Sequence, residues 1–187
     1  MEIRTAVRRL DGLVTNLLNQ TRLEAGSVKP RMDWCDPRDL IVAARRAVGE
    51  RMEGHPLEID LRPNGTMFFA DAVLMEQVIA NLLHNAAVHT PRGTAIRISA
   101  GATERPPRVF VSVEDEGPGI SPELRSRIFS KFQSGPTARP GGLGLGLSIV
   151  RGFMLAQGGD VSLTLPVKGA RFTVYLPRLP EGNVPNG

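Results

Sequence analysis

The sequence predicts an α+β protein, a two-layer α/β sandwich in which helices pack on one face of a mixed, mostly antiparallel sheet. Segments with apolar residues at helical spacing are separate from segments that alternate apolar and polar residues, as strands do. Most of the strand-like segments follow one another through turn signals, which favours antiparallel pairing. The 187 residues, 41% hydrophobic and 22% charged, are sufficient for one core of ordinary size.

Two helices are expected before the first long strand. Residues 1–24 have an apolar stripe at 3.6-residue spacing, and Gly26 and Pro30 are signals for the end of that helix. The stripe consists of Leu10, Leu13, Val14, Leu17, Leu18 and Thr21. Such a stripe packs either on a partner helix or back on the following domain, and the pattern alone does not decide between them. Residues 36–52 begin with an Asp-Pro entry and continue as a second amphipathic helix.

The remaining elements alternate between strand and helix patterns. Strands are expected at 57–61, 66–70, 94–100, 108–115, 160–165 and 170–176, and the turn signal RPNG separates the first two. Helices are expected at 72–89 with Asp71 as its cap, near 122–127, and from the glycine-rich segment to about Gln157. The last residues, 179–187, have the composition of a disordered tail.

Composition excludes several classes of function. The formal charge is +4, but the basic residues are scattered and form no block interleaved with aromatics, so nucleic acid is not expected as a partner. Cys35 is the single cysteine and there are three histidines, which leaves no disulfide framework and no pattern for zinc. No apolar run is long enough to cross a bilayer or to resemble a signal peptide.

Two asparagines on the helix at 72–89 are the first candidates for chemistry. Asn81 and Asn85 are four residues apart and share a face of this largely apolar helix. An amide oxygen suits a Mg²⁺ ion that phosphates already hold, because such a site needs few protein ligands. The alternative is that both amides bond to nearby backbone groups.

The segment EDEGPGI, residues 114–120, places Asp115 at the end of a strand. Its carboxylate has the chemistry to accept a hydrogen bond from an exocyclic amino group such as that of adenine, while Gly117 and Gly119 leave room for a ring. The same residue types are also common in a plain turn, and the segment alone does not separate the two interpretations.

Two further segments complete the candidate site. The segment IFSKF, residues 128–132, places aromatics around Lys131, with a core pair of phenylalanines as the alternative. The segment RPGGLGLGLSIVRGF, residues 139–153, places glycines directly before an apolar helix, whose N-terminus suits an anion such as phosphate; a flexible loop is the alternative.

The order of these segments carries a family resemblance. NLLHNAAVHT, DEGPGI, IFSKF and GLGLGL resemble the N box, first glycine box, F box and second glycine box of the ATP-binding domain of sensor histidine kinases. The resemblance covers residues 33–178, and residues 13–26 look like the end of the second helix of that family's dimerisation and phosphoacceptor hairpin. The ending GLGLGLSIVRGFMLAQGG is similar to sensor kinases of the potassium-responsive type.

The resemblance implies an ATP- and Mg²⁺-binding kinase domain. Asn85 would be the Mg²⁺ ligand and Asn81 a phosphate-side contact, Asp115 would hold the adenine amino group, and residues 130–143 would form a lid over ATP. The implied catalytic residues are Asn81, Asn85 and Lys131, and the implied nucleotide contacts are Asn81, Asn85, His89, Asp115, Gly117, Gly119, Ile120, Lys131, Phe132, Arg139, Gly142, Leu143, Gly144, Leu145, Gly146 and Leu147. For His89 a partly buried ring without a binding role is the alternative.

Two departures from the family pattern qualify this expectation. Val88 stands where many sensor kinases have Lys or Arg, which makes Lys131 and Arg139 the expected phosphate-neutralising residues. The phosphorylated histidine of the family would lie before the first residue of this chain, so the resemblance implies residues 1–28 as the end of the hairpin, 29–178 as the catalytic domain and 179–187 as the tail.

The resemblance also implies partners and a location. The partners would be the phosphoacceptor hairpin, a second copy of the full-length kinase and a response regulator, and the domain would be cytoplasmic in a protein anchored in the bacterial inner membrane. Two other classes stay open: an ATP hydrolase of the same fold, which Asn81 disfavours because an amide cannot activate water, and a degenerate module that only packs on partners.

Overall fold

The computed structural model describes residues 2–61, 66–132 and 144–179, with backbone only for 2–9 and 11. The helices are α1 (Glu2–Glu24), α2 (Pro37–Val48), the 3-10 helix η1 (Gly49–Met52), α3 (Ala72–His89), α4 (Pro122–Arg125) and α5 (Gly146–Ala156). The strands are β1 (Asp33–Cys35), β2 (Leu57–Leu61), β3 (Phe68–Ala70), β4 (Ile96–Glu104), β5 (Pro107–Asp115), β6 (Asp160–Thr164) and β7 (Ala170–Pro177). None of the helices in these ranges is long and apolar enough to span a membrane.

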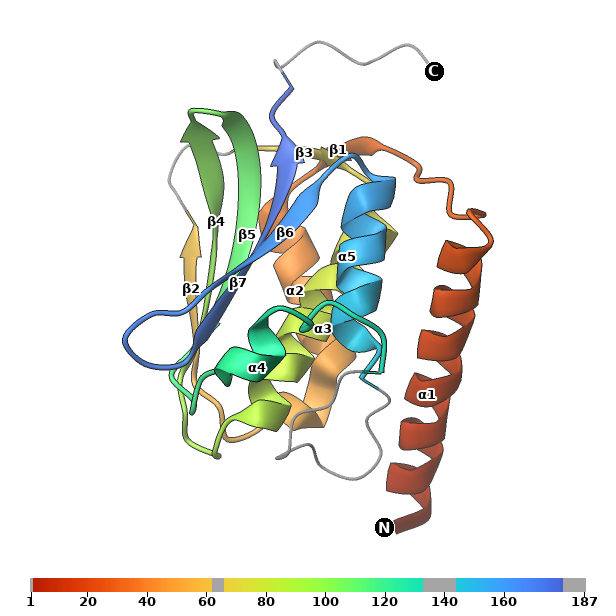
Figure 1. Cartoon of the computed structure of the whole chain (residues 1–187), viewed down its shortest axis with the longest axis vertical. Helices are drawn as coiled ribbons and strands as arrows, with labels where there is room; N and C mark the ends of the chain where they lie inside the picture. The colour runs from red at the N-terminus through yellow and green to blue at the C-terminus, as the bar shows by residue number, and fades with distance from the viewer. Residues whose placement is uncertain (1, 62–65, 133–143, 180–187) are drawn as a thin grey trace.

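The main sheet has five strands in the order β2-β4-β5-β7-β6. The β2–β4 pair is parallel and the other three pairs are antiparallel, so the sheet is mixed and mostly antiparallel. Helices α2, α3 and α5 lie together on one face of it (Figure 1). The two-layer α+β class predicted from the sequence is therefore confirmed.

The two strands on either side of the RPNG signal do not pair with each other. β2 joins the main sheet beside β4, whereas β3 pairs with β1 in a separate two-stranded sheet. This small sheet is held by Phe68 and Ala70, which are buried in the core, and by an edge-to-face contact between Trp34 and Phe69. Strand β1 was missed by the sequence analysis because three residues are too few to show a period of two.

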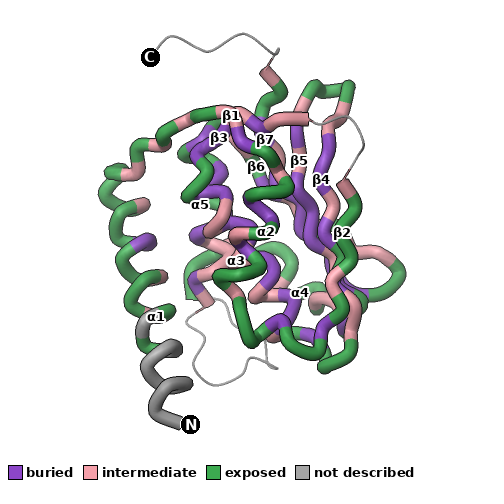
Figure 2. Tube along the Cα trace, turned by 180° about the vertical axis from the view of Figure 1, so that it is seen from behind, coloured by how far each residue is buried: buried purple, intermediate pink, exposed green. Residues whose placement is uncertain are grey.

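The core lies between the sheet and the helices, where Figure 2 shows the buried stretches in purple. Helix α3 is central to it, since its apolar positions at helical spacing face both the sheet and the neighbouring helices. The largest fully buried side chains are Phe68, Phe153, Ile41, Met75, Ile79, Leu82, Leu83, Ile96, Ile98, Leu145, Ile149 and Met154.

Asp71 connects three parts of the domain. Its Oδ1 caps α3 by accepting from the Leu74 N–H at 3.0 Å, as the sequence predicted, and its Oδ2 accepts from the Arg31 N–H at 2.7 Å. Its own N–H donates to Gln157 Oε1, just after α5. One buried residue thus ties the start of α3 to two other parts: its carboxylate holds the segment that follows α1, and its backbone N–H holds the end of α5.

Helix α1 lies along α5 at the edge of the molecule, drawn in red in Figure 1. The described residues that face the domain are both polar and apolar: Asn19 donates to Gln77 at 3.0 Å, Ser148 donates to Gln20 at 3.3 Å, and Leu23 packs on α5 beside Gly152. Four residues of the apolar stripe, Leu10, Val14, Leu17 and Leu18, are instead between 47% and 63% exposed. The helix therefore contacts its own domain through a face other than the predicted stripe.

Candidate functional site

The two asparagines of α3 lie beside the start of α5. Asn81 and Asn85 are both partly exposed and lie one turn apart. A Cβ placed on Gly146, the first residue of α5, would lie 3.6 Å from Asn81 Oδ1, an ordinary van der Waals distance. The first residue of α5 therefore lies directly beside the amide of Asn81.

Among the described residues, no side chain caps the N-terminus of α5. Leu145 is its N-cap residue, and the Ser148 hydroxyl bonds to the Leu145 carbonyl rather than to the first N–H groups. Gly144, just before, has a φ of 63°, a conformation that strongly favours glycine. Uncapped N–H groups and the positive end of the helix dipole therefore lie next to Asn81.

Asp115, at the end of β5, is the buried carboxylate of the region. Its Oδ1 accepts from the Gly117 N–H at 2.9 Å. Burial raises the pKa of Asp115 above its usual value, and hydrogen bonds from the backbone of Gly117 and Ala170 partly oppose that rise. The carboxylate accepts two backbone hydrogen bonds and retains unused lone pairs for another donor.

Glycines allow the neighbouring backbone to pack tightly around Asp115. A Cβ on Gly117 would lie 2.6 Å from Thr90 Cγ2 and 2.8 Å from Asp115 Oδ1, and one on Gly169 would lie 1.7 Å from the Asp115 carbonyl oxygen. Gly119 has a φ of 76°. The sequence analysis identified Gly117 and Gly119 but missed Thr90 and Gly169, because only the fold brings the end of α3 and the start of β7 beside Asp115.

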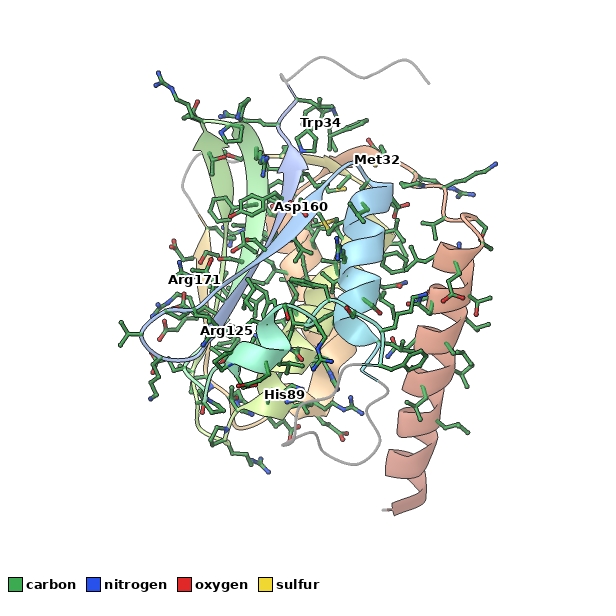
Figure 3. All side chains as sticks on the ribbon, in the orientation of Figure 1. Met32, Trp34, His89, Arg125, Asp160 and Arg171 are labelled. Carbon is green, nitrogen blue, oxygen red and sulfur yellow. The ribbon has the colours of Figure 1, made fainter. Side chains whose placement is uncertain are left out.

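His89 and the hydrophobic members of the predicted set lie around these groups. His89 is exposed at the end of α3, at the opposite end of the molecule from Trp34 (Figure 3). Leu145 is buried in the core, while Ile120 and Leu147 are partly buried against it. Leu145 therefore has only its backbone to offer to a ligand.

Lys131 and Phe132 are the last two residues of the segment IFSKF. Lys131 Nζ lies 2.5 Å from Glu24 Oε1 of α1, and Phe132 is 66% exposed with a φ of 58°. Phe129 makes an edge-to-face contact with Phe172 of β7, which agrees with the core interpretation for that residue. The predicted contacts Arg139, Gly142 and Leu143 lie outside the described residues.

A histidine between the two asparagines has an arginine partner that the sequence did not indicate. His84 Nε2 and Arg51 Nη1, from η1, form a hydrogen bond across the surface of α3. Burial lowers the pKa of His84 to about 4, and the charges of Arg51 and His89 contribute to the same shift. The ring is therefore neutral at physiological pH and accepts the hydrogen bond of the guanidinium.

Comparison with known proteins identifies the family. Residues 70–180 match the model of the histidine kinase-, DNA gyrase B- and HSP90-like ATPases. The chain belongs to this family. Among curated members it is similar to the sensor protein KdpD of Mycobacterium tuberculosis (33% identity over 186 residues, 93% of this chain and 20% of the relative). It is also similar to the probable sensor histidine kinase TcrY of the same species (35% over 181 residues, 94% of this chain and 37% of the relative).

Solved structures of this ATPase family agree with the fold. Full-length ShkA in complex with AMPPNP superposes with a TM-score of 0.79 at 28% identity, over 94% of this chain and 37% of that one. Histidine kinase AdeS of Acinetobacter baumannii superposes with a TM-score of 0.76 at 23% identity, over 95% of this chain and 82% of that one, and shows the fold alone. The resemblance to sensor histidine kinases is thus confirmed, and the chain spans about a fifth of KdpD.

The geometry of this ATPase domain fits a purine nucleotide. The carboxylate of Asp115 is buried and can accept a hydrogen bond from an amino group on a flat ring, and the backbone at Gly117 packs directly beside it. The uncapped start of α5 beside Asn81 suits phosphate. Asn85 adds a neutral oxygen of the kind that Mg²⁺ accepts alongside phosphate oxygens.

Proposed function

We propose that this chain is the catalytic part of a sensor histidine kinase, which binds Mg-ATP and donates the γ-phosphoryl group to a histidine outside the chain. The observation that carries the proposal is the arrangement at one end of the sandwich, where Asp115, Asn81 and the uncapped start of α5 offer the two kinds of contact that a nucleotide needs. Family membership and the similarity to named sensor kinases support it.

Each group has a distinct task in the proposal. Asp115 accepts a hydrogen bond from the adenine amino group, and Gly117 and Gly119 let the adjoining loop pack closely beside that carboxylate. Asn81 and the first N–H groups of α5 orient the phosphates, and Asn85 provides an amide oxygen to Mg²⁺. Bound Mg-ATP supplies the phosphoryl group and part of the charge neutralisation, so these residues act mainly by positioning.

The exposed stripe of α1 supports the proposed partners. In the proposal, residues 1–28 end a dimerisation and phosphoacceptor hairpin, residues 29–178 form the catalytic domain, and residues 179–187 are a tail. Leu10, Val14, Leu17 and Leu18 would then pack in a four-helix arrangement with the hairpin of a second copy, because their own domain leaves them exposed. A response regulator receives the phosphoryl group, and the whole protein is membrane-anchored with this part in the cytoplasm.

The Asn85→Ala variant tests the Mg²⁺ role. It removes the proposed metal ligand from a partly exposed position, so Mg²⁺-dependent ATP binding is expected to disappear while the fold is retained. Calorimetric titration with ATP, with and without Mg²⁺, measures this. Gln77→Ala, which removes an amide two turns earlier on α3, is the matched control, and an Asn85→Ala affinity within twofold of wild type would contradict the assignment.

The Asp115→Asn variant tests the base contact. Guanine has no amino group at the position where adenine has its exocyclic one, so the substitution is expected to weaken ATP binding more than GTP binding. Glu114→Gln is the control, because it removes the neighbouring carboxylate, whose side chain bonds to Arg171 on the opposite face of the sheet. Equal losses for ATP and GTP in Asp115→Asn would make Asp115 a structural residue.

Phosphoryl transfer is tested with a separately supplied hairpin. Incubation of the chain with γ-labelled ATP is expected to label a dimeric hairpin of a related sensor kinase on histidine, with acid-labile label, and to leave the chain itself unlabelled. Phosphate release is expected to stay far below about 10 per second, the median turnover of enzymes, because Asn81 cannot act as a base toward water. Rapid hydrolysis would instead favour the ATP hydrolase of the same fold.

A further inference from the structure

Arg51 is a cation that the fold places against the partly exposed side of α3, at His84. It extends from η1, which packs on α3, and its Nη1 forms the hydrogen bond with His84 Nε2. Arg51 itself is exposed, so only its tip is fixed on the helix. A guanidinium has five N–H donors, and the single ring nitrogen of His84 accepts one of them, which leaves donors for a further acceptor.

The position of His84 directs this guanidinium toward the proposed phosphate site. On a helix, residues three and four apart are surface neighbours, so His84 lies next to Asn81 on one side and next to Val88 on the other. Asn81 in turn lies against the uncapped start of α5. The fixed end of Arg51 is therefore one helical turn from the groups proposed to hold the phosphates.

Among the described residues near this site, Arg51 offers the positive charge that a bound triphosphate requires. A triphosphate carries several negative charges, and Asn81, Asn85 and Val88 contribute no positive one. Lys131 forms an ion pair with Glu24 of α1. Arg51 has a histidine ring nitrogen, rather than a carboxylate, as its hydrogen-bond partner on α3, so its positive charge stays available to an anion.

We infer that Arg51 is a phosphate-binding residue of this domain, held in place by His84 and supplying the positive charge that Val88 does not. The inference rests on the proposed function, since it assigns a residue of η1 to the same ATP site. Arginine suits the role because its planar group binds phosphate oxygens in pairs. His84 acts as a positioning residue, through Arg51.

The test compares ATP with adenosine, which has the base but no phosphate. In NMR-monitored titrations of the full chain, Arg51→Met is expected to raise the dissociation constant for ATP about tenfold, the effect of losing one charged hydrogen bond. Its dissociation constant for adenosine is expected to stay within twofold of wild type. Arg46→Met is the matched control, because it removes an exposed arginine from the preceding helix α2, and ATP binding is expected to stay within twofold.

Two further variants separate binding from folding. Arg51→Lys retains the charge without the planar group and is expected to lose less ATP affinity than Arg51→Met. His84→Leu retains Arg51 but removes its hydrogen-bond partner, so a loss of affinity for ATP, and none for adenosine, is expected. An Arg51→Met affinity for ATP within twofold of wild type, or an equal loss for adenosine, would overturn the inference. If the wild type binds ATP more tightly than adenosine and Arg51→Met does not change this, the inference fails alone; if the wild type binds neither ligand, the proposed function fails with it.

Discussion

Helices α3 and α1 both pack along α5, but the buried residues are apolar on α3 and polar in the described part of α1. The inward face of α3 is apolar throughout, and its polar residues Asn81, His84 and Asn85 lie on the partly exposed side. Among the described side chains of α1, the buried ones are Asn19 and Gln20, Leu23 is partly buried against α5, and four residues of the stripe are exposed: Leu10, Val14, Leu17 and Leu18. Apolar burial is the main source of stability, so α3 belongs to the core, whereas α1 is attached by contacts that are individually weak.

The different attachment of the two helices suits the role proposed for each. A helix that carries binding residues must hold them in fixed positions, and α3 does so because eight of its residues are buried. A helix that must move relative to the ATP site is better attached through polar contacts. Lys131 and Ser148, which contact Glu24 and Gln20 of α1, both lie in segments proposed to surround the phosphates.

The largest expected difference between the two helices is in the free energy of unfolding. Leu83 is fully buried on α3, and Leu83→Ala is expected to lower the unfolding free energy by about 2–5 kcal/mol because it leaves a cavity. Leu18→Ala on α1 removes the same atoms from a side chain that is 60% exposed, and a change within about 0.5 kcal/mol is expected. Urea denaturation at low micromolar concentration measures both. Similar losses would show that the stripe of α1 is buried in solution.

The sequence predicted α3 more completely than it predicted the setting of α1. Eighteen residues of α3 with a cap at Asp71 give a strong periodic signal, and the asparagines stand out against it. For α1 the stripe was recognised, but the face that contacts the domain was not, because Asn19 and Gln20 become buried only against residues far along the chain.

The same limit applies to the candidate site. Asn81, Asn85, Asp115 and the glycines stand in short motifs, so their residue types and order were sufficient to propose them. The contact of Arg51 with His84 joins residues 33 positions apart on different helices, and no local pattern encodes it. Likewise, β2 pairs in parallel with β4 across the whole of α3, a pairing that the turn signal after β2 does not reveal.

The free energy of unfolding is expected to depend on pH through His84, on the partly exposed side of α3. The pKa of His84 is lowered to about 4 in the folded chain, from an ordinary value of 6.5, so the unfolded chain takes up the proton first as the pH falls. The stability associated with neutral His84 is therefore complete above pH 6.5 and decreases between pH 6.5 and about 4. The upper limit of the loss is about 3.5 kcal/mol, at about 1.4 kcal/mol per pH unit.

A substitution isolates this effect from the other titrating groups. His84→Gln retains a hydrogen-bond acceptor for Arg51 but does not titrate, so the difference in unfolding free energy between variant and wild type is expected to change across that pH window and to be constant above it. The measurement is urea denaturation at several pH values without nucleotide or Mg²⁺. Parallel pH profiles for the two proteins would mean that the pKa of His84 is not lowered on folding.

The smallest expected effect concerns the polar contact between α1 and α3 itself. Asn19 donates to Gln77 at 3.0 Å, and a hydrogen bond of this kind contributes about 0.5–1.5 kcal/mol net, because both amides bond to water when the helices separate. A double-mutant cycle with Asn19→Ala and Gln77→Ala is therefore expected to give a coupling energy of about 1 kcal/mol, well below the loss in Leu83→Ala. The loss in any such variant is also limited by the free energy of docking α1, since a helix that has already separated has no contact left to lose. A coupling energy comparable to the loss in Leu83→Ala would make α1 as integral to the fold as α3, and its polar inward face would then need an explanation other than reversible docking.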